Sequence, residues 1–273
     1  MRRLLLLLTL PLTFLLSSCG FRKTNRVATS IFPLTWLVKK LFPTYEVYQI
    51  IKPGTNPHAY DLTPKDAVEI ESSRKVFLIG NLEPFAGKIP PKKRVEVIEI
   101  LNLPPSVNPH LWLSPKRWLQ LARRLPDSVK DLKFNIKSWN NTVFELERLD
   151  QKYEKVLGQL KPKVVLILPA FYWTFEDYGG KVLYILQPNP QGGLSPRRFT
   201  QAVEELKNNP DAVVVYSTTN PRAGEIIEKL KENVPHLKTV GLNPLIWETQ
   251  GDYISLMEEN LQKIKAAFGG KTE

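Results

Sequence analysis

NIKSWNNTVFELERLDQKYEKVLGQL, residues 135–160, is the longest helical pattern in the chain. Apolar side chains recur in it at steps of three and four residues, which marks one apolar helix face: Ile136, Trp139, Val143, Leu146, Leu149, Tyr153, Val156 and Leu160. The stretch contains no proline, and its only glycine is Gly158. A helix of about 25 residues is about 37 Å long at 1.5 Å per residue. We therefore expect a helix that reaches from one domain to another.

Strand and helix patterns alternate on both sides of this helix. The predicted strands lie at 26–29, 46–51, 75–79 and 95–100 before it, and at 163–168, 182–186, 212–216 and 238–242 after it. Helical patterns separate them, and Thr63-Pro64-Lys65-Asp66 is a typical helix start. The strand runs of the second half are continuously apolar, as in sheets covered on both faces. The predicted fold is α/β, with two α/β lobes that have mainly parallel four-stranded sheets and are joined by one long backbone helix.

The first residues are typical of an export signal. Arg2 and Arg3 precede an apolar run at 4–16, which is too short to cross a bilayer about 30 Å thick as a helix. The run ends in Leu16-Ser17-Ser18-Cys19, which resembles the lipobox of bacterial lipoproteins. The resemblance implies cleavage before Cys19 and lipid attachment to its sulfur. A plain signal peptide that ends near a cysteine is the alternative.

These features divide the chain into five predicted segments. They are a signal peptide at 1–18, a lipidated linker at 19–25, an N-terminal α/β lobe at 26–133, the linking helix at 134–160 and a C-terminal α/β lobe at 161–273. The mature protein is expected to be extracytoplasmic, lipid-anchored to the cell membrane on the periplasmic side. Ligands bind at the carboxyl ends of parallel strands, so the expected site is the cleft between the lobes.

Lysine and arginine outnumber the acidic residues, 38 to 27, which gives a formal charge of +11. An excess of positive charge is also found in nucleic-acid-binding proteins, but export argues against that class. The sequence has no helix with clustered basic residues and interleaved aromatic residues. We interpret the excess as a solvated basic surface, or one that faces anionic lipid headgroups.

Two of the three histidines stand in the same tripeptide. Asn56-Pro57-His58 follows the predicted strand 46–51, and Asn108-Pro109-His110 follows the predicted strand 95–100. Both histidines are therefore expected on strand-to-helix loops at the carboxyl edge of the first sheet, each stiffened by the preceding proline. Imidazole is the commonest metal ligand among side chains, and two of them make half of a tetrahedral site. The alternative is that both are ordinary loop or core histidines. The third histidine, His236, is interpreted as a surface residue away from the cleft.

The sequence resembles the zinc/manganese group of solute-binding proteins of ABC transporters. Residues 53–64, PGTNPHAYDLTP, are similar to the family segment PGxxPHxYxxTP, and residues 108–115, NPHLWLSP, to DPHxWLDP. Weaker similarities lie at 81–85, at 170–179 and at 253–261. The resemblance covers essentially all of the mature chain. It implies two α/β lobes, a long backbone helix and one divalent metal held between the lobes by four side chains.

The resemblance assigns only part of that ligand set to this chain. His58 and His110 fall on the first two ligand positions. The third position, usually His or Glu, is Leu168, and the fourth, usually Asp, is Asn243. The second lobe is therefore expected to have lost its usual ligands.

This departure makes weaker metal binding the expectation. Leu168 cannot bind a metal, and the neutral amide of Asn243 is a poorer partner for a hard cation than a carboxylate. Glu176, Asp177 and Glu248 are the acidic residues near these positions that could replace the lost ligands.

The expected function is the capture of a divalent metal, Zn or Mn, as cargo for an ABC permease in the membrane, with His58, His110 and Asn243 as the predicted metal ligands. The protein is expected to be a monomer that binds no nucleic acid and is not an enzyme. One alternative keeps the fold without transition-metal binding, as a lipoprotein that binds another solute or acts as an interaction protein. Another is a metal hydrolase, which needs a carboxylate base such as Asp61 near the histidines.

Overall fold

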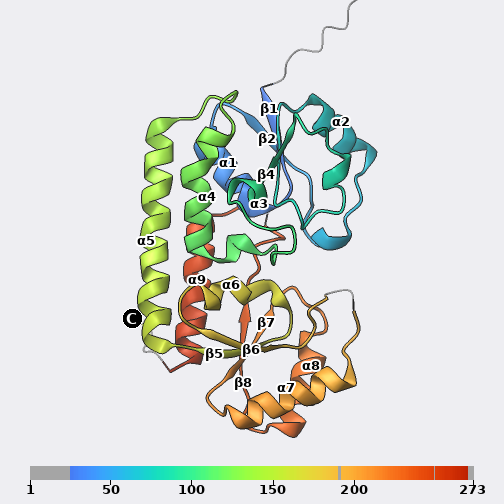
Figure 1. The fold of residues 1–273 in the computed structure, drawn as a ribbon, viewed down its shortest axis with the longest axis vertical. Coiled ribbons are helices and arrows are strands. Elements are labelled where there is room, and N and C mark those ends of the chain that lie inside the picture. Colours follow the sequence, from blue (N-terminus) through green and yellow to red (C-terminus); the bar gives the residue numbers. More distant parts are fainter. Residues whose placement is uncertain (1–24, 190–191, 249, 270–273) are drawn as a thin grey trace, which may run out of the picture.

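The computed structural model describes residues 25–189, 192–248 and 250–269. The predicted signal peptide at 1–18 and the predicted lipidation site Cys19 lie outside these described residues. Figure 1 shows two lobes stacked along the longest axis of the molecule.

The first lobe is built around a four-stranded parallel sheet with the strand order β2-β1-β3-β4. Its strands are β1 (Arg26–Thr29), β2 (Glu46–Gln49), β3 (Val76–Leu78) and β4 (Arg94–Glu96). Its helices are α1 (Phe32–Leu41), α2 (Pro64–Ser72), α3 (Val97–Ile100) and α4 (Pro115–Ser128), with 3-10 turns η1 (Pro57–Ala59), η2 (Ala86–Lys88) and η3 (Leu111–Leu113).

The second lobe repeats this topology, with the strand order β6-β5-β7-β8 and parallel pairing throughout. Its strands are β5 (Lys163–Leu166), β6 (Lys181–Ile185), β7 (Val213–Ser217) and β8 (Lys238–Leu242). Its helices are α6 (Tyr172–Glu176), α7 (Pro196–Asn208), α8 (Ala223–Asn233) and α9 (Tyr253–Ala267), with a 3-10 turn η4 (Pro169–Phe171). The prediction of two α/β lobes with four-stranded parallel sheets is confirmed.

The linking helix is α5 (Ile136–Leu160), which runs along both lobes (Figure 1). The Asn135 side chain caps it by accepting a hydrogen bond from the Ser138 N–H at 2.9 Å. It ends at Lys161, which has a left-handed φ of 43° and is followed by Pro162. The buried face of the helix contains Thr142, Leu146, Leu149, Tyr153 and Leu157.

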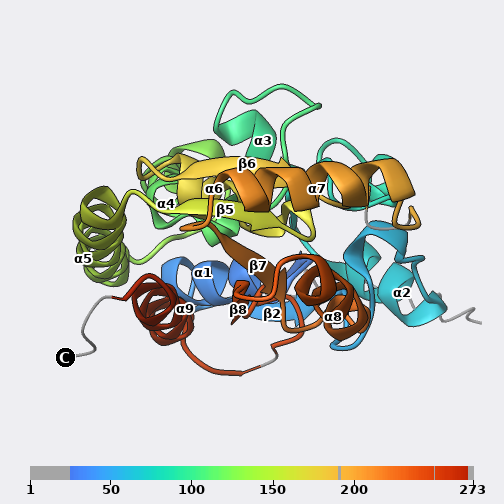
Figure 2. The same ribbon diagram turned by 90° about the horizontal axis from the view of Figure 1, so that it is seen from below.

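Helix α9 is a second element that spans both lobes. Figures 1 and 2 show it beside α5, although it follows the last strand of the second lobe. Its first residue, Tyr253, packs between Trp36 and Trp118 of the first lobe, with ring centres 5.1 and 6.1 Å away. The Tyr153 hydroxyl of α5 donates to the Met257 carbonyl of α9 at 2.7 Å. The lobes are therefore held together by two adjacent helices.

The predicted strand at 95–100 is shorter than expected. The strand β4 ends at Glu96, and the chain continues as the single helical turn α3. Asn102, with a left-handed φ of 55°, closes this turn, because the Leu103 N–H bonds the Ile98 carbonyl. Short apolar runs of this kind fit a strand or a buried helical turn equally well, so periodicity alone could not decide.

The hydrophobic core is nearly continuous between the lobes. One cluster of buried side chains extends from the first sheet through α5 and α9 to one face of the second sheet. A smaller cluster fills the other face of the second sheet, where Val165, Ile167 and Val214 pack against α7 and α8.

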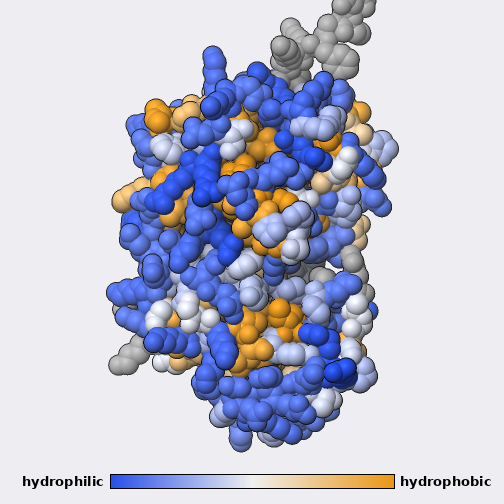
Figure 3. All heavy atoms as spheres, viewed as in Figure 1, coloured by the Kyte–Doolittle hydropathy of each residue, from blue (hydrophilic) through white to orange (hydrophobic). Residues whose placement is uncertain are grey.

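The face in Figure 3 is mostly hydrophilic on both lobes, with smaller hydrophobic areas between the polar side chains. Across the described residues, no helix combines the length and apolar character that crossing a bilayer would require.

Candidate functional site

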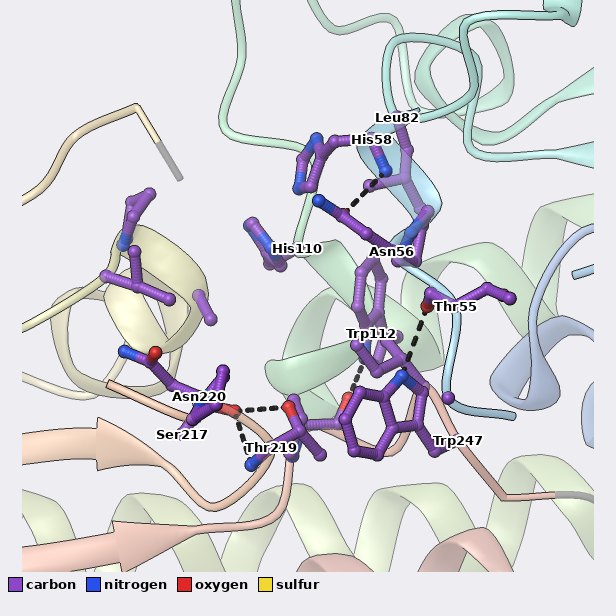
Figure 4. Close-up of a pocket in the computed structure, with 18 residues that line it drawn as sticks. Thr55, Asn56, His58, Leu82, His110, Trp112, Ser217, Thr219, Asn220 and Trp247 are labelled. Carbon is purple, nitrogen blue, oxygen red and sulfur yellow. Dashed lines mark hydrogen bonds between the residues drawn. The ribbon is translucent and has the colours of Figure 1, made fainter. Parts of the chain in front are cut away.

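A cavity of about 400 Å3 lies between the lobes, where the carboxyl ends of both sheets meet (Figure 4). The first lobe contributes residues that follow β2, β3 and β4, and the second lobe contributes residues that follow β5, β7 and β8. Both predicted histidine ligands, His58 and His110, line this cavity, and so does Leu168.

His58 is held by a short capped turn. Its backbone N–H donates to the side-chain oxygen of Asn56 at 3.0 Å, and Pro57 opens the 3-10 turn η1. The loop continues to Tyr60, whose hydroxyl donates to the buried Asp66 carboxylate at 2.8 Å. Asp66 and Thr63 form the capping box that begins α2, as the sequence predicted. The position of His58 is therefore fixed by its own turn and by the start of α2.

His110 is held by a similar turn with one more contact. The Asn108 side-chain oxygen accepts the His110 backbone N–H at 3.1 Å and lies 2.8 Å from Nδ1 of the imidazole ring. The Asn108 amide nitrogen donates to the Pro169 carbonyl of the second lobe at 2.8 Å. This contact identifies the Asn108 oxygen as the atom that faces His110, so Nδ1 carries the proton and Nε2 has the available lone pair.

The two imidazole rings converge. Their centres are 5.4 Å apart, with an angle of 52° between the ring planes. A metal about 2.0–2.1 Å from a nitrogen of each ring lies roughly 3 Å from each ring centre, so tetrahedral ligands place the centres about 5 Å apart. The rings are therefore spaced as two ligands of one metal would be.

Burial disfavours the charged form of both imidazoles. Burial lowers the pKa of His58, and burial together with the neighbouring His58 ring lowers the pKa of His110 to about 3. Only 8% of the His110 surface is exposed. A neutral imidazole offers the lone pair that a metal needs.

Trp112 forms the wall beside His110, with the two ring centres 5.2 Å apart. Its indole N–H donates to the Pro244 carbonyl at 2.8 Å, and the Tyr253 hydroxyl donates to the Trp112 carbonyl at 2.7 Å. These contacts connect the histidine-bearing loop to the second lobe. Trp247 also lines the cavity and closes its side by donating to the Thr55 carbonyl at 3.1 Å (Figure 4).

The second-lobe wall is largely apolar. Leu168 and Ala170 follow β5, and Pro244, Ile246 and Trp247 follow β8. Its polar groups come from the loop after β7.

The hydroxyls of Ser217 and Thr219 hydrogen-bond each other at 2.8 Å. Asn220 lies next to them, and its side-chain oxygen accepts the Arg222 N–H. This wall thus offers hydroxyl and amide groups, which are weak metal ligands.

Asn243, the third predicted ligand, is not brought together with the histidines. It is not among the described residues that line the cavity. Its side-chain oxygen accepts the Leu245 N–H at 2.8 Å, and its amide nitrogen donates to the Glu248 carboxylate at 2.9 Å. These bonds fix the turn between β8 and α9. We therefore leave Asn243 out of the proposed ligand set.

The acidic residues considered as replacements are also engaged elsewhere. Asp177 forms a two-pronged ion pair with Arg117 at 2.6 and 2.8 Å, and Glu176 accepts the Val182 N–H. Glu248 accepts the amide of Asn243. In the part of the chain that the structure describes, no group of three or more His, Cys, Asp or Glu side chains could hold a metal ion.

The sequence reasoning missed the role of the two asparagines before the prolines. Asn56 and Asn108 accept the backbone N–H two residues later, and Asn108 also faces the ring of its histidine. The repeated Asn-Pro-His triplet carried this signal, because asparagine commonly bonds its own backbone two residues on. Ser217 and Thr219 had no signal in the sequence, since they become neighbours of the histidines only through lobe packing.

The chain forms two α/β lobes, each with a parallel sheet, and the strands of both sheets end at a shared cavity. This arrangement is typical of a two-lobed solute-binding protein. Residues 27–267 match the family described as ZnuA, zinc-uptake complex component A, periplasmic. The chain belongs to this family, which consists of solute-binding transport components. The resemblance that the two histidine motifs indicated is confirmed.

Two known proteins illustrate the similarity in sequence. The zinc-binding lipoprotein AdcA of Streptococcus pneumoniae serotype 4 is 27% identical over 307 residues, which cover 97% of this chain and 61% of AdcA. This chain thus spans less than two thirds of AdcA. A putative metal-binding protein of Thermotoga maritima is 24% identical over 287 residues, which cover 98% of this chain and 100% of that protein.

The fold is similar to the crystal structure of the Zn(II)-bound ZnuA-like domain of Streptococcus pneumoniae AdcA. The TM-score is 0.71 at 25% sequence identity, over 90% of this chain and 99% of that domain.

Proposed function

We propose that this chain captures a divalent metal ion, Zn2+ or Mn2+, in the interlobe cavity and delivers it to the permease of an ABC transporter. The observation that carries the proposal is the convergence of His58 and His110, whose ring centres are 5.4 Å apart in the cavity wall. Membership of the zinc-uptake component family supports the transport role.

His58 and His110 supply two nitrogen ligands in this proposal. The remaining coordination positions are filled by water or by a ligand that arrives with the metal, because no described residue of the second-lobe wall has a carboxylate, thiolate or imidazole. Binding is therefore expected to be weaker than in a site with four protein ligands.

Delivery requires that the cargo favours one arrangement of the lobes over another. A ligand shifts such an equilibrium only by its different contacts with the two arrangements. Contacts that join the cavity walls include those of Trp247 with Thr55, of Asn108 with Pro169 and of Trp112 with Pro244. Cargo that touches both walls would stabilise these contacts, and their opening would release it.

We infer that the protein works outside the cytoplasm as a monomer, anchored by a lipid on Cys19 at the periplasmic side of the membrane. The inferred role is binding and delivery, without a catalytic step and without nucleic acid. The candidate base Asp61 supports this, since 91% of its side-chain surface is exposed and its partner is Lys88. The segment boundaries at 133/134 and 160/161 stay a prediction.

Equilibrium dialysis with metal analysis tests the proposal. The wild-type protein is expected to retain one Zn2+ or Mn2+, and the His58→Ala/His110→Ala variant is expected to retain none. His236→Ala is the matched control, because this histidine is exposed and lies outside the cavity lining. Equal metal retention by the double variant and the control would refute the proposed site.

The apolar second-lobe wall favours one alternative, in which the same cavity binds a solute without a transition metal. That wall contains Leu168, Ala170, Pro244, Ile246 and Trp247. A wild-type protein that is free of metal after dialysis, and whose melting temperature is unchanged by Zn2+ or Mn2+, would support this alternative.

A further inference from the structure

The described residues that line the cavity include no carboxylate or thiolate that could offset the charge of a metal ion. Among its described residues, the only histidine, acidic, basic, cysteine or tyrosine side chains are those of His58 and His110, and an imidazole ligand adds no negative charge. A divalent cation held by them keeps its full charge of 2+. Moving such a charge out of water is costly unless an opposite charge accompanies it. The missing negative charge therefore has to come with the cargo.

The size of the cavity leaves room for such a partner. Its volume of about 400 Å3 is within the range of small-molecule sites, about 300–1,000 Å3. A single cation would fill a small part of it. The apolar wall of Leu168, Ile246 and Trp247 can cover a carbon skeleton. These side chains offer a hydrated metal ion no hydrogen bond and no ligand atom.

The hydroxyl pair on the opposite wall can receive the polar end of an organic ligand. Ser217 and Thr219 share one hydrogen bond of 2.8 Å, and each hydroxyl carries one hydrogen. One hydroxyl donates within the pair, so the other can donate to a ligand. A carboxylate oxygen is a suitable acceptor, and a metal cation is not.

The charge of the whole chain points in the same direction. Without the predicted signal peptide, which contains Arg2 and Arg3, the chain has a formal charge of +9. This charge repels a free cation and does not repel a neutral complex.

We propose that the cargo is a net-neutral complex of one divalent metal with one small dicarboxylate. The metal binds His58 and His110, and the dicarboxylate spans the cavity towards Ser217 and Thr219. Two imidazole nitrogens replace two water ligands of the complex, and no covalent bond is formed or broken. This inference rests on the proposed function and adds the class of the cargo to it.

Zn2+ titrations with and without malate, compared at equal free Zn2+ concentrations, test the inference. Malate is a four-carbon dicarboxylate. If the complex binds, excess malate lowers the apparent Kd for zinc by roughly tenfold or more, and dialysis with labelled malate recovers one malate per zinc. Ethylenediamine, which chelates zinc without adding negative charge, is expected to give no such gain.

The possible outcomes separate the two proposals. Zinc binding that depends on His58 and His110 but does not change with malate overturns this inference and leaves the proposed function intact. No binding of Zn2+ or of Mn2+, with or without malate, overturns both.

A substitution in the wall gives an independent test. Leu168→Glu adds a carboxylate that can offset the metal charge, so we expect tighter binding of zinc alone and loss of the malate effect. Leu168→Gln introduces a side chain with the shape of glutamate but without its charge, and this variant is expected to keep the malate effect. Circular dichroism and melting temperatures verify that both variants fold. Retention of the full malate effect by a folded Leu168→Glu variant would contradict the inference.

Discussion

The two Asn-Pro-His triplets share one backbone hydrogen bond, although His58 lies within η1 and His110 precedes η3. In each, the asparagine oxygen accepts the histidine N–H, and the proline restricts the turn. The sequence predicted stiff loops from the prolines alone. We did not predict that Asn108 also contacts the His110 ring, although this contact is local. The bond from Asn108 to Pro169 across the cleft depends on lobe packing and had no signal in the sequence.

We expect Asn108→Ala to weaken zinc binding roughly 10- to 100-fold, the usual effect of removing a partner that orients a metal-binding histidine. Asn108→Asp keeps an oxygen acceptor at Nδ1 of His110 and is expected to restore much of the affinity. Isothermal titration calorimetry of the two variants measures the difference. Equal affinities of the alanine variant and the wild type would show that Asn108 does not orient the ring.

Leu168 lines the second-lobe side of the cavity, at the position where the family resemblance places a ligand. Leu168→His supplies a third imidazole, and we expect it to tighten zinc binding by roughly tenfold or more. Leu168→Phe is the control, with a ring that cannot bind metal. Adding Asn243→Asp is expected to give no further gain, because Asn243 faces Leu245 and Glu248. A large additional gain in competition titrations would mean that Asn243 reaches the cavity after all.

At the scale of elements, the pattern of alternating strands and helices predicted most of the fold. The limits of α5 and the capping box of α2 were readable because caps and periodicity are local. The convergence of His58 and His110 was harder to predict, because it depends on residues far apart in the sequence. They follow β2 and β4, the two outer strands of the sheet, which lie roughly 14 Å apart at about 4.8 Å per strand. Only the path of the two loops brings the rings together, so the family resemblance was needed to predict it.

The Asp66 carboxylate secures the start of α2 and the loop of His58. Burial raises the pKa of Asp66. The hydrogen bonds that the carboxylate accepts from Thr63, Tyr60 and Tyr48 lower it by a larger amount, so the resulting pKa lies below the usual 3.8. The ionised form therefore stabilises the fold above the usual pKa of aspartate, and this contribution is lost as the pH falls through the lowered value.

We expect Asp66→Asn to lower the free energy of unfolding by about 2 kcal/mol or more at pH 7, because several bonds to a charged acceptor are weakened. The difference from the wild type should shrink as the pH falls below about 4. Chemical denaturation over a pH series measures both effects. Asp61→Asn, at an exposed position of the same loop, is the control. A stability difference that does not change with pH would refute the role of the charge.

At the scale of the whole molecule, the lobes are joined by more than the predicted helix. Helix α9 returns to the first lobe, where Tyr253 contacts Trp36 and Trp118. The ion pair of Arg117 with Asp177 joins α4 of the first lobe to the end of α6 in the second lobe. The sequence did not predict this second connection, since its hydrogen bonds join residues far apart in the chain. The result is a cavity between two lobes that share one core.

The claim on which the whole account depends is that one metal binds both His58 and His110. An anomalous difference map of zinc-loaded crystals, recorded at the zinc absorption edge, tests it most directly. We expect one strong peak about 2.0–2.1 Å from a ring nitrogen of each histidine, with the rest of its coordination shell formed by non-protein atoms. A zinc peak at other side chains, or no peak between these two rings, would contradict the account.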